Sequence, residues 1–129
     1  MRIFKPILIL LLIAPNVTMA ADYRCDVKSK YDSEHIYSHE HIERSQFSVL
    51  IRDRGSTATI SRCSFSHSAQ KVTCDSYKVD KILSDQNVFI KKFYVFTSQY
   101  DVQVFKNLTF VENNGRGSIA YGKCILTAP

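Results

Sequence analysis

The chain has 129 residues, 45% of them hydrophobic, and a formal net charge of +5. This length suits one domain with a core of its own, and the charge lacks the dense basic stripe of nucleic-acid-binding proteins. The longest apolar run, residues 7–14, is shorter than the roughly 20 residues that a membrane-spanning helix requires. We therefore expect no nucleic-acid partner and no membrane span in the mature chain.

The first twenty residues have the layout of a secretory signal peptide. Arg2 and Lys5 form a basic start, residues 7–14 form the apolar centre, and Thr18 and Ala20 supply small residues where a signal peptidase cuts. Cleavage after Ala20 removes both basic residues and lowers the formal charge from +5 to +3. The expected organisation is a signal peptide over residues 1–20 and a single β domain over residues 21–129.

All four cysteines follow the predicted cleavage site, which places them in a disulfide-permissive compartment. Four cysteines allow three pairings, and the sequence cannot choose among them. We favour Cys63–Cys74, which would clamp two neighbouring strands, and Cys25–Cys124, which would tie the start of the domain to its end. The sequence has no Cys-x-x-Cys pair, which argues against a structural zinc site.

From residue 44 onward, short apolar segments alternate with turn residues, a pattern typical of antiparallel β-structure. An Asn-Gly step at residues 114–115 lies between two strand patterns and favours a hairpin. Residues 76–83 fit either a helical turn or a strand. The predicted strands cover residues 44–52, 57–65, 70–77, 88–96, 100–105, 107–112 and 118–126. The fold prediction is an all-β protein, a small antiparallel sandwich or barrel with two disulfides.

Two resemblances bear on origin and function. Residues 92–96, 98–102, 110–117 and 122–124, with their Glu-Asn-Asn-Gly-Arg-Gly run, resemble a family of small secreted bacterial proteins that has no assigned activity. The resemblance covers the last third of the chain and implies a bacterial periplasmic or secreted location. The opening Tyr-x-Cys-Asp (23–26) and closing Tyr-x-x-Cys (121–124) are similar to the ends of small periplasmic lysozyme inhibitors. The interior departs from those inhibitors because it has no tryptophan and no Ser-Gly-x-x-Tyr loop.

Three of the four histidines lie within seven residues, at His35, His39 and His41. Imidazole nitrogens bind zinc, copper and nickel well. On a strand the three histidines would share a face, but His35 and His39 would lie about 13 Å apart, too far for one ion. His39 and His41 would then need a further ligand, and His67 or Glu43 could supply it. The alternative is a polar, exposed edge strand or loop.

Arg52, Arg54, Arg62 and Arg116 would cluster if their turns met at one end of the sheet. Arginines on loops suit the carboxylates or phosphates of glycans and partner proteins. We accordingly expect a non-enzymatic binding or structural module of the cell envelope that requires no cofactor. Its partner would be an envelope protein or an anionic glycan, bound chiefly through Arg52, Arg54 and Arg116. The alternatives are a periplasmic metal-binding protein and an inhibitor of a lysozyme-like hydrolase.

Overall fold

The computed structural model describes Ile3 and residues 20–127, so the predicted signal peptide lies outside the described residues except for Ile3 and Ala20. The elements, in chain order, are β1 (Ala21–Tyr31), α1 (His39–Ser45), β2 (Ser48–Asp53), β3 (Ala58–Ser66), β4 (Lys71–Lys78), β5 (Lys81–Asp85), β6 (Ile90–Val95), the 3₁₀ turn η1 (Phe96–Ser98), β7 (Tyr100–Val104), β8 (Thr109–Asn113) and β9 (Ile119–Thr127). No helix among these residues is long and apolar enough to cross a bilayer.

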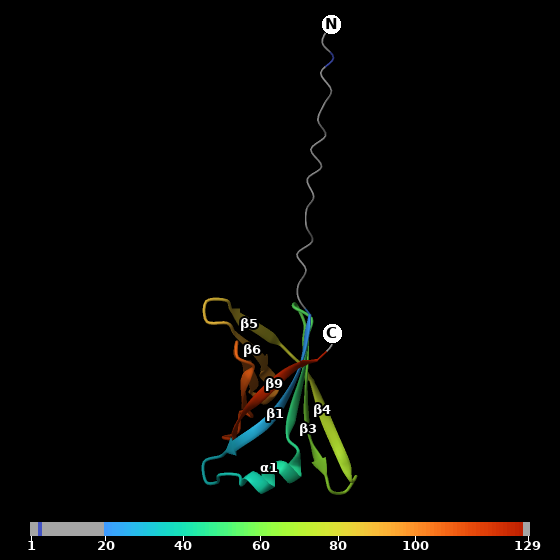
Figure 1. Ribbon diagram of the computed structural model, residues 1–129, viewed down its shortest axis with the longest axis vertical. Helices are drawn as coiled ribbons and strands as arrows, with labels where there is room; N and C mark the ends of the chain where they lie inside the picture. The colour runs from blue at the N-terminus through green and yellow to red at the C-terminus, as the bar shows by residue number, and fades with distance from the viewer. Residues whose placement is uncertain (1–2, 4–19, 128–129) are drawn as a thin grey trace.

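The nine strands of the described region form one antiparallel sheet in the order β4-β3-β2-β1-β9-β8-β7-β6-β5. The sheet curls into a half-barrel (Figure 1), which confirms the predicted all-β fold. The register pairs Ala21 with Asp53 at one end and Tyr31 with Ile119 at the other. We call the first the terminal end and the second the α1 end, because α1 connects β1 to β2 there.

β4 and β5 are the two edges of the sheet, yet only Val79 and Asp80 separate them in the chain. The Val79 amide donates to the Ala58 carbonyl of β3 (2.9 Å), and the Asp80 amide donates to the Tyr94 carbonyl of β6 (2.8 Å). These two residues therefore carry the chain directly from one edge strand of the sheet to the other. The two edges meet at this crossing, and β4 and β5 diverge from it in opposite directions (Figure 1).

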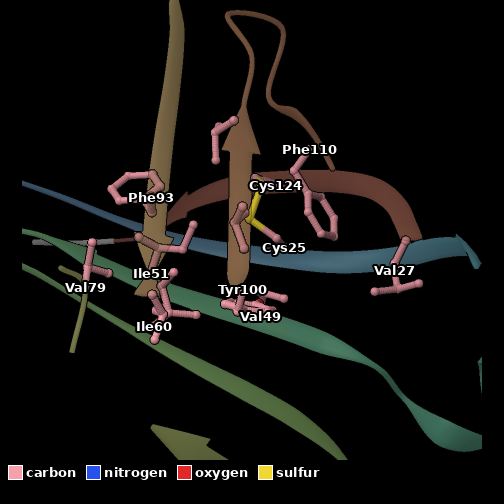
Figure 2. Packing of buried hydrophobic residues seen from close by; sticks show 14 of the residues in the cluster. Cys25, Val27, Val49, Ile51, Ile60, Val79, Phe93, Tyr100, Phe110 and Cys124 are labelled. Atoms are coloured by element: carbon pink, nitrogen blue, oxygen red, sulfur yellow. A yellow bond between two sulfur atoms is a disulfide. The ribbon is translucent and has the colours of Figure 1, made fainter. Parts of the chain in front are cut away.

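The core fills the concave side of the curl, because alternate residues of each strand point inward. In β2, for example, Val49 and Ile51 are buried while Leu50 and Arg52 are exposed. Figure 2 shows the Cys25–Cys124 disulfide among Val49, Ile51, Ile60, Phe93, Tyr100 and Phe110. Full burial of a large apolar side chain stabilises the fold by roughly 1.5–3 kcal/mol, so this cluster holds the two halves of the sheet together.

Both expected disulfides form. Cys25 and Cys124 are direct partners in the β1–β9 register, and Cys63 and Cys74 are direct partners in the β3–β4 register. The described residues contain no free cysteine. Two disulfides suit a protein of an oxidising compartment.

Local differences from the expected strands have identifiable causes. The strand predicted over residues 88–96 begins at Ile90, because Phe89 adopts a left-handed conformation (φ 54°) in the preceding turn. Residues 76–83, which fitted a helical turn or a strand, form the end of β4, the crossing and the start of β5. α1 was not predicted, and it is capped by the Ser38 side chain, which accepts from the His41 amide.

Candidate binding site

A buried carboxylate joins three strands inside the curl. Glu112 of β8 is 5% exposed, and its Oε2 accepts from the Tyr100 hydroxyl of β7 (2.6 Å) and from Arg62 Nε of β3 (3.1 Å). The Arg62 guanidinium also lies 4.9 Å from the Tyr100 ring centroid. Charge-assisted hydrogen bonds of this kind fix the position of both partners.

The electrostatics of the cluster favour an ionised pair beside a neutral tyrosine. Burial raises the pKa of Tyr100 well above its usual range, and the negative charge of Glu112 raises it further. Burial disfavours the Arg62 cation, but Glu112, Tyr100 and Tyr77 together outweigh this effect, and the pKa of Arg62 is raised. The contact between Arg62 Nε and Glu112 Oε2 is thus an ion pair beside a neutral tyrosine.

A polar cavity of about 170 Å³ lies beside the cluster, towards the α1 end. Its charged lining residues are Lys30, Arg62, Asp75 and Glu112. Lys30 Nζ lies 4.3 Å from the ring centroid of Phe47, a cation–π contact, and forms no ion pair with any described residue. Burial lowers the pKa of Lys30, while nearby Glu112 opposes the shift. The ammonium is thus held against an aromatic face without an anionic partner.

The cavity can accept a carboxylate. Glu112 engages Arg62 through Nε, and the two terminal nitrogens of the guanidinium have no hydrogen-bond partner among residues 20–127. A planar guanidinium with free terminal donors binds carboxylates in a bidentate manner. The volume is below the roughly 300–1,000 Å³ of pockets for drug-sized molecules, so it suits one acidic side chain or one sugar carboxylate.

A second buried ion pair closes the other half of the curl. Asp53 of β2 is fully buried; its Oδ2 accepts from Lys91 Nζ of β6, and its Oδ1 accepts from the Gly55 amide at 2.8 Å. Burial raises the pKa of the nearby Tyr23 hydroxyl. Because both carboxylate oxygens are engaged, we assign this pair to holding β2 against β6 rather than to binding.

The predicted histidine face does not form, because α1 begins at His39 and so the segment is not one strand. Tyr37 lies between His35 and His41, with ring centroids 4.5 Å and 4.9 Å away, respectively. His39 Nε2 lies 2.9 Å from Glu43 Oε1, one turn along α1. Within residues 20–127, no three His, Cys, Asp or Glu side chains are placed to hold a metal ion. The structure therefore does not gather His35, His39 and His41 around one point.

His67, the other suggested ligand, lies in the β3–β4 turn, where its ring packs 5.3 Å from that of Phe65. A groove of about 430 Å³ separates α1 from the outer face of β1 and is lined by His39, Glu43 and Arg24 among others. In this groove the His39 and Glu43 side chains pair with each other.

The four arginines do not cluster. Arg54 lies in the β2–β3 turn at the terminal end, where Nη1 contacts Asp22 Oδ1 at 2.7 Å. Arg52 is exposed on the outer face of β2 close to it. Arg116 is exposed in the β8–β9 turn at the α1 end, and Arg62 points into the curl. The condition for a cluster, that the turns meet at one end, is therefore not met, because the β2–β3 and β8–β9 turns lie at opposite ends of the sheet.

Lys30 and Glu112 were not predicted as site residues, and Arg62 was predicted only as part of an arginine cluster. One signal was available: Glu112 follows Phe110 on the inward face of its strand, and Arg62 follows Ile60 in the same way. A charged residue on the apolar face of a strand indicates a buried ion pair or a site. No family model, curated protein or solved structure matches the chain.

Proposed function

We propose that this protein is a non-enzymatic binding module of the bacterial cell envelope, exported by its signal peptide to the periplasm or beyond. It captures an anionic group of its partner, an envelope protein or an acidic glycan, in the cavity at the α1 end. Lys30 supplies an unpaired cation, and Arg62 supplies the terminal donors that Glu112 leaves free.

The observation that carries this proposal is that two cationic side chains, Lys30 and Arg62, line the same half-buried cavity. Glu112 compensates Arg62, but Lys30 has no counter-ion within ion-pair distance among the described residues. A cation held out of bulk water gains more from an incoming carboxylate than an exposed lysine does. Asp75 and Glu112 line the same cavity, so its charged groups balance, and the attraction for a carboxylate is confined to the side where Lys30 and the terminal nitrogens of Arg62 lie.

The test compares Lys30→Gln with Lys123→Gln, which removes the same charge from an exposed position on β9. The probes are poly-L-glutamate and polygalacturonate, which present peptide and sugar carboxylates, and affinity is measured by calorimetric titration. We expect Lys30→Gln to weaken binding by about fivefold or more and Lys123→Gln to weaken it by less than about twofold. Equal losses, or no binding of either polymer by the unsubstituted protein, would contradict the proposal.

A further inference from the structure

β4 is the longer of the two edge strands, with eight residues against five in β5. It pairs with β3 along its whole length, and its other edge has no strand partner among the described residues. All of its residues are exposed except Tyr77, which is half-buried. A row of unpaired backbone groups on such an edge is a template for an added strand.

The backbone groups that face the free edge can be identified. Directly opposed residues in antiparallel strands lie about 4.5 Å apart when they exchange no hydrogen bond and about 5.5 Å apart when they do. The Cα atoms of Cys63 and Cys74 lie 4.1 Å apart, which marks a non-bonded pair. The amide of Cys74 therefore points away from β3. Successive amides of a strand point to opposite sides, so the Val79 amide points to β3, as its hydrogen bond shows. The amides that point away from β3 are those of Val72, Cys74, Ser76 and Lys78.

The free amides of β4 point to the side on which β6 pairs with β5, and β6 covers only part of that side. The amide of Asp80, two residues after Lys78, points to the same side and donates to the Tyr94 carbonyl of β6. β6 ends at Val95, where the chain turns into η1. Beyond Val95, no strand of the described residues pairs with the free edge of β4.

The free edge is also rigid. A hairpin that projects from its sheet is marginally stable by itself, but the Cys63–Cys74 disulfide clamps this one at its middle. The hydroxyls of Ser61 and Ser76 add a cross-strand hydrogen bond of 2.8 Å. The eight-residue β3–β4 register has no bulge, and β4 contains no proline, so it lacks two of the usual devices against strand addition.

Charge indicates the occupant. Lys71 and Lys78 stand at the two ends of β4, and opposite charges placed across neighbouring strands are stabilising whereas like charges are destabilising. An incoming segment with acidic residues at those two positions is attracted at both ends. We propose that β4 accepts an extended, acidic segment of a partner polypeptide as an added strand. This deepens the proposed function by naming the partner as a polypeptide, and it rests on that function only in taking the protein to be a binding module.

The experiment compares Ser76→Pro with Ser76→Ala in the oxidised protein. Proline removes an amide that points to the free edge and leaves the ladder to β3 intact, whereas alanine removes only the hydroxyl. The probe is a capped eight-residue peptide of β-branched residues with glutamates at both ends, and its counterpart has lysines there. Fluorescence anisotropy gives the affinities, and amide hydrogen exchange shows which backbone groups become protected.

We expect the acidic peptide to bind and to protect the amides of Val72, Cys74, Ser76 and Lys78. We expect Ser76→Pro to weaken binding about tenfold or more and Ser76→Ala less than about twofold. The acidic peptide methylated on the amides that face β4 should also bind about tenfold more weakly or worse. This second test leaves the protein unchanged. The lysine peptide should bind at least about fivefold more weakly than the acidic one.

Several results would overturn the inference: no binding of the acidic peptide, equal binding by both Ser76 variants, or protection outside β4. A dimer in sedimentation that Ser76→Pro dissociates would identify a second copy of this chain as the occupant instead. The two proposals separate cleanly. If Lys30→Gln weakens binding and Ser76→Pro does not, the cavity stands and strand addition falls. If Ser76→Pro weakens binding and Lys30→Gln does not, strand addition stands and the proposed role of the cavity falls.

Discussion

Glu112 shows how one residue can organise the interior at the α1 end. A single carboxylate oxygen accepts from both Tyr100 and Arg62. Breaking a buried ion pair by removing one partner leaves the other charge uncompensated, which costs far more than the pair contributes. The half-buried Arg62 can therefore present its terminal nitrogens to the cavity because Glu112 is behind it.

The raised pKa of Tyr100 predicts a loss of stability at high pH. Above about pH 10 the tyrosine of the unfolded chain loses its proton while folded Tyr100 keeps it, so the unfolded state is favoured as pH rises. Tyr100→Phe removes this effect. At pH 7 we expect the variant to be less stable by about 1 kcal/mol because it loses a hydrogen bond.

At pH 11 that difference should shrink by about 1.4 kcal/mol, the contribution of one pH unit above the unfolded pKa, so that Tyr100→Phe is no longer the less stable protein. Urea denaturation of both proteins at the two pH values measures the change. The lysines titrate in both proteins, so the comparison isolates Tyr100. A difference that is the same at pH 7 and pH 11 would contradict the prediction.

At the scale of elements, the contact between β1 and β9 depends on Gly122. A Cβ atom at this position would lie 1.9 Å from the Asp26 carbonyl oxygen and 2.6 Å from Cε1 of Phe110. The register between β1 and β9 shifts nearby, between Val27 and Ser29. The absence of a side chain therefore lets β1 approach β9 above the Phe110 ring.

Gly122→Ala should consequently destabilise the fold by roughly 2–3 kcal/mol, because the backbone of β1 or the buried ring must shift. Chemical denaturation measures this free energy. The matched control is Lys123→Ala, an exposed neighbour on the same strand, which should remain within about 0.5 kcal/mol of the unsubstituted protein. If the Gly122→Ala protein is as stable as this control, β1 and β9 do not lie so close together that they exclude a Cβ atom at this position.

Turn chemistry and strand alternation predicted most of the strands after residue 44 and both disulfides. β1 was missed although Tyr23, Cys25 and Val27 alternate with charged residues in the period that a strand requires. α1 has only seven residues and one buried side chain, Ile42, too few to show a helical period. The pairing of Arg62 with Glu112 could not be predicted, because the two residues are 50 positions apart in the chain and meet only through the curl of the sheet.

At the scale of the whole molecule, the two disulfides should contribute unequally to stability. Their sequence separations are 99 residues for Cys25–Cys124 and 11 for Cys63–Cys74. In the chain-entropy model these loops correspond to about 4.7 and about 2.8 kcal/mol. We expect the Cys25→Ala/Cys124→Ala protein to lose more of its free energy of unfolding than the Cys63→Ala/Cys74→Ala protein.

Urea denaturation of the two double variants tests this order. Hydrogen exchange should separate them further, because loss of Cys63–Cys74 loosens the β3–β4 hairpin while loss of Cys25–Cys124 affects the junction of both halves. If the two variants lose equal stability and exchange alike, the assignment of separate roles is wrong.

The pairing of β1 with β9 also sets an order in time. Every other ladder joins strands that follow one another in the chain, whereas this one joins Asp22 to Thr127. Local hairpins close quickly, and distant strands must wait until the intervening chain has folded. A chain that enters an oxidising compartment amino-terminus first therefore presents Cys25 early and its partner last. In a chain exported in that order, the native pairs form only where Cys25 remains a thiol until Cys124 arrives.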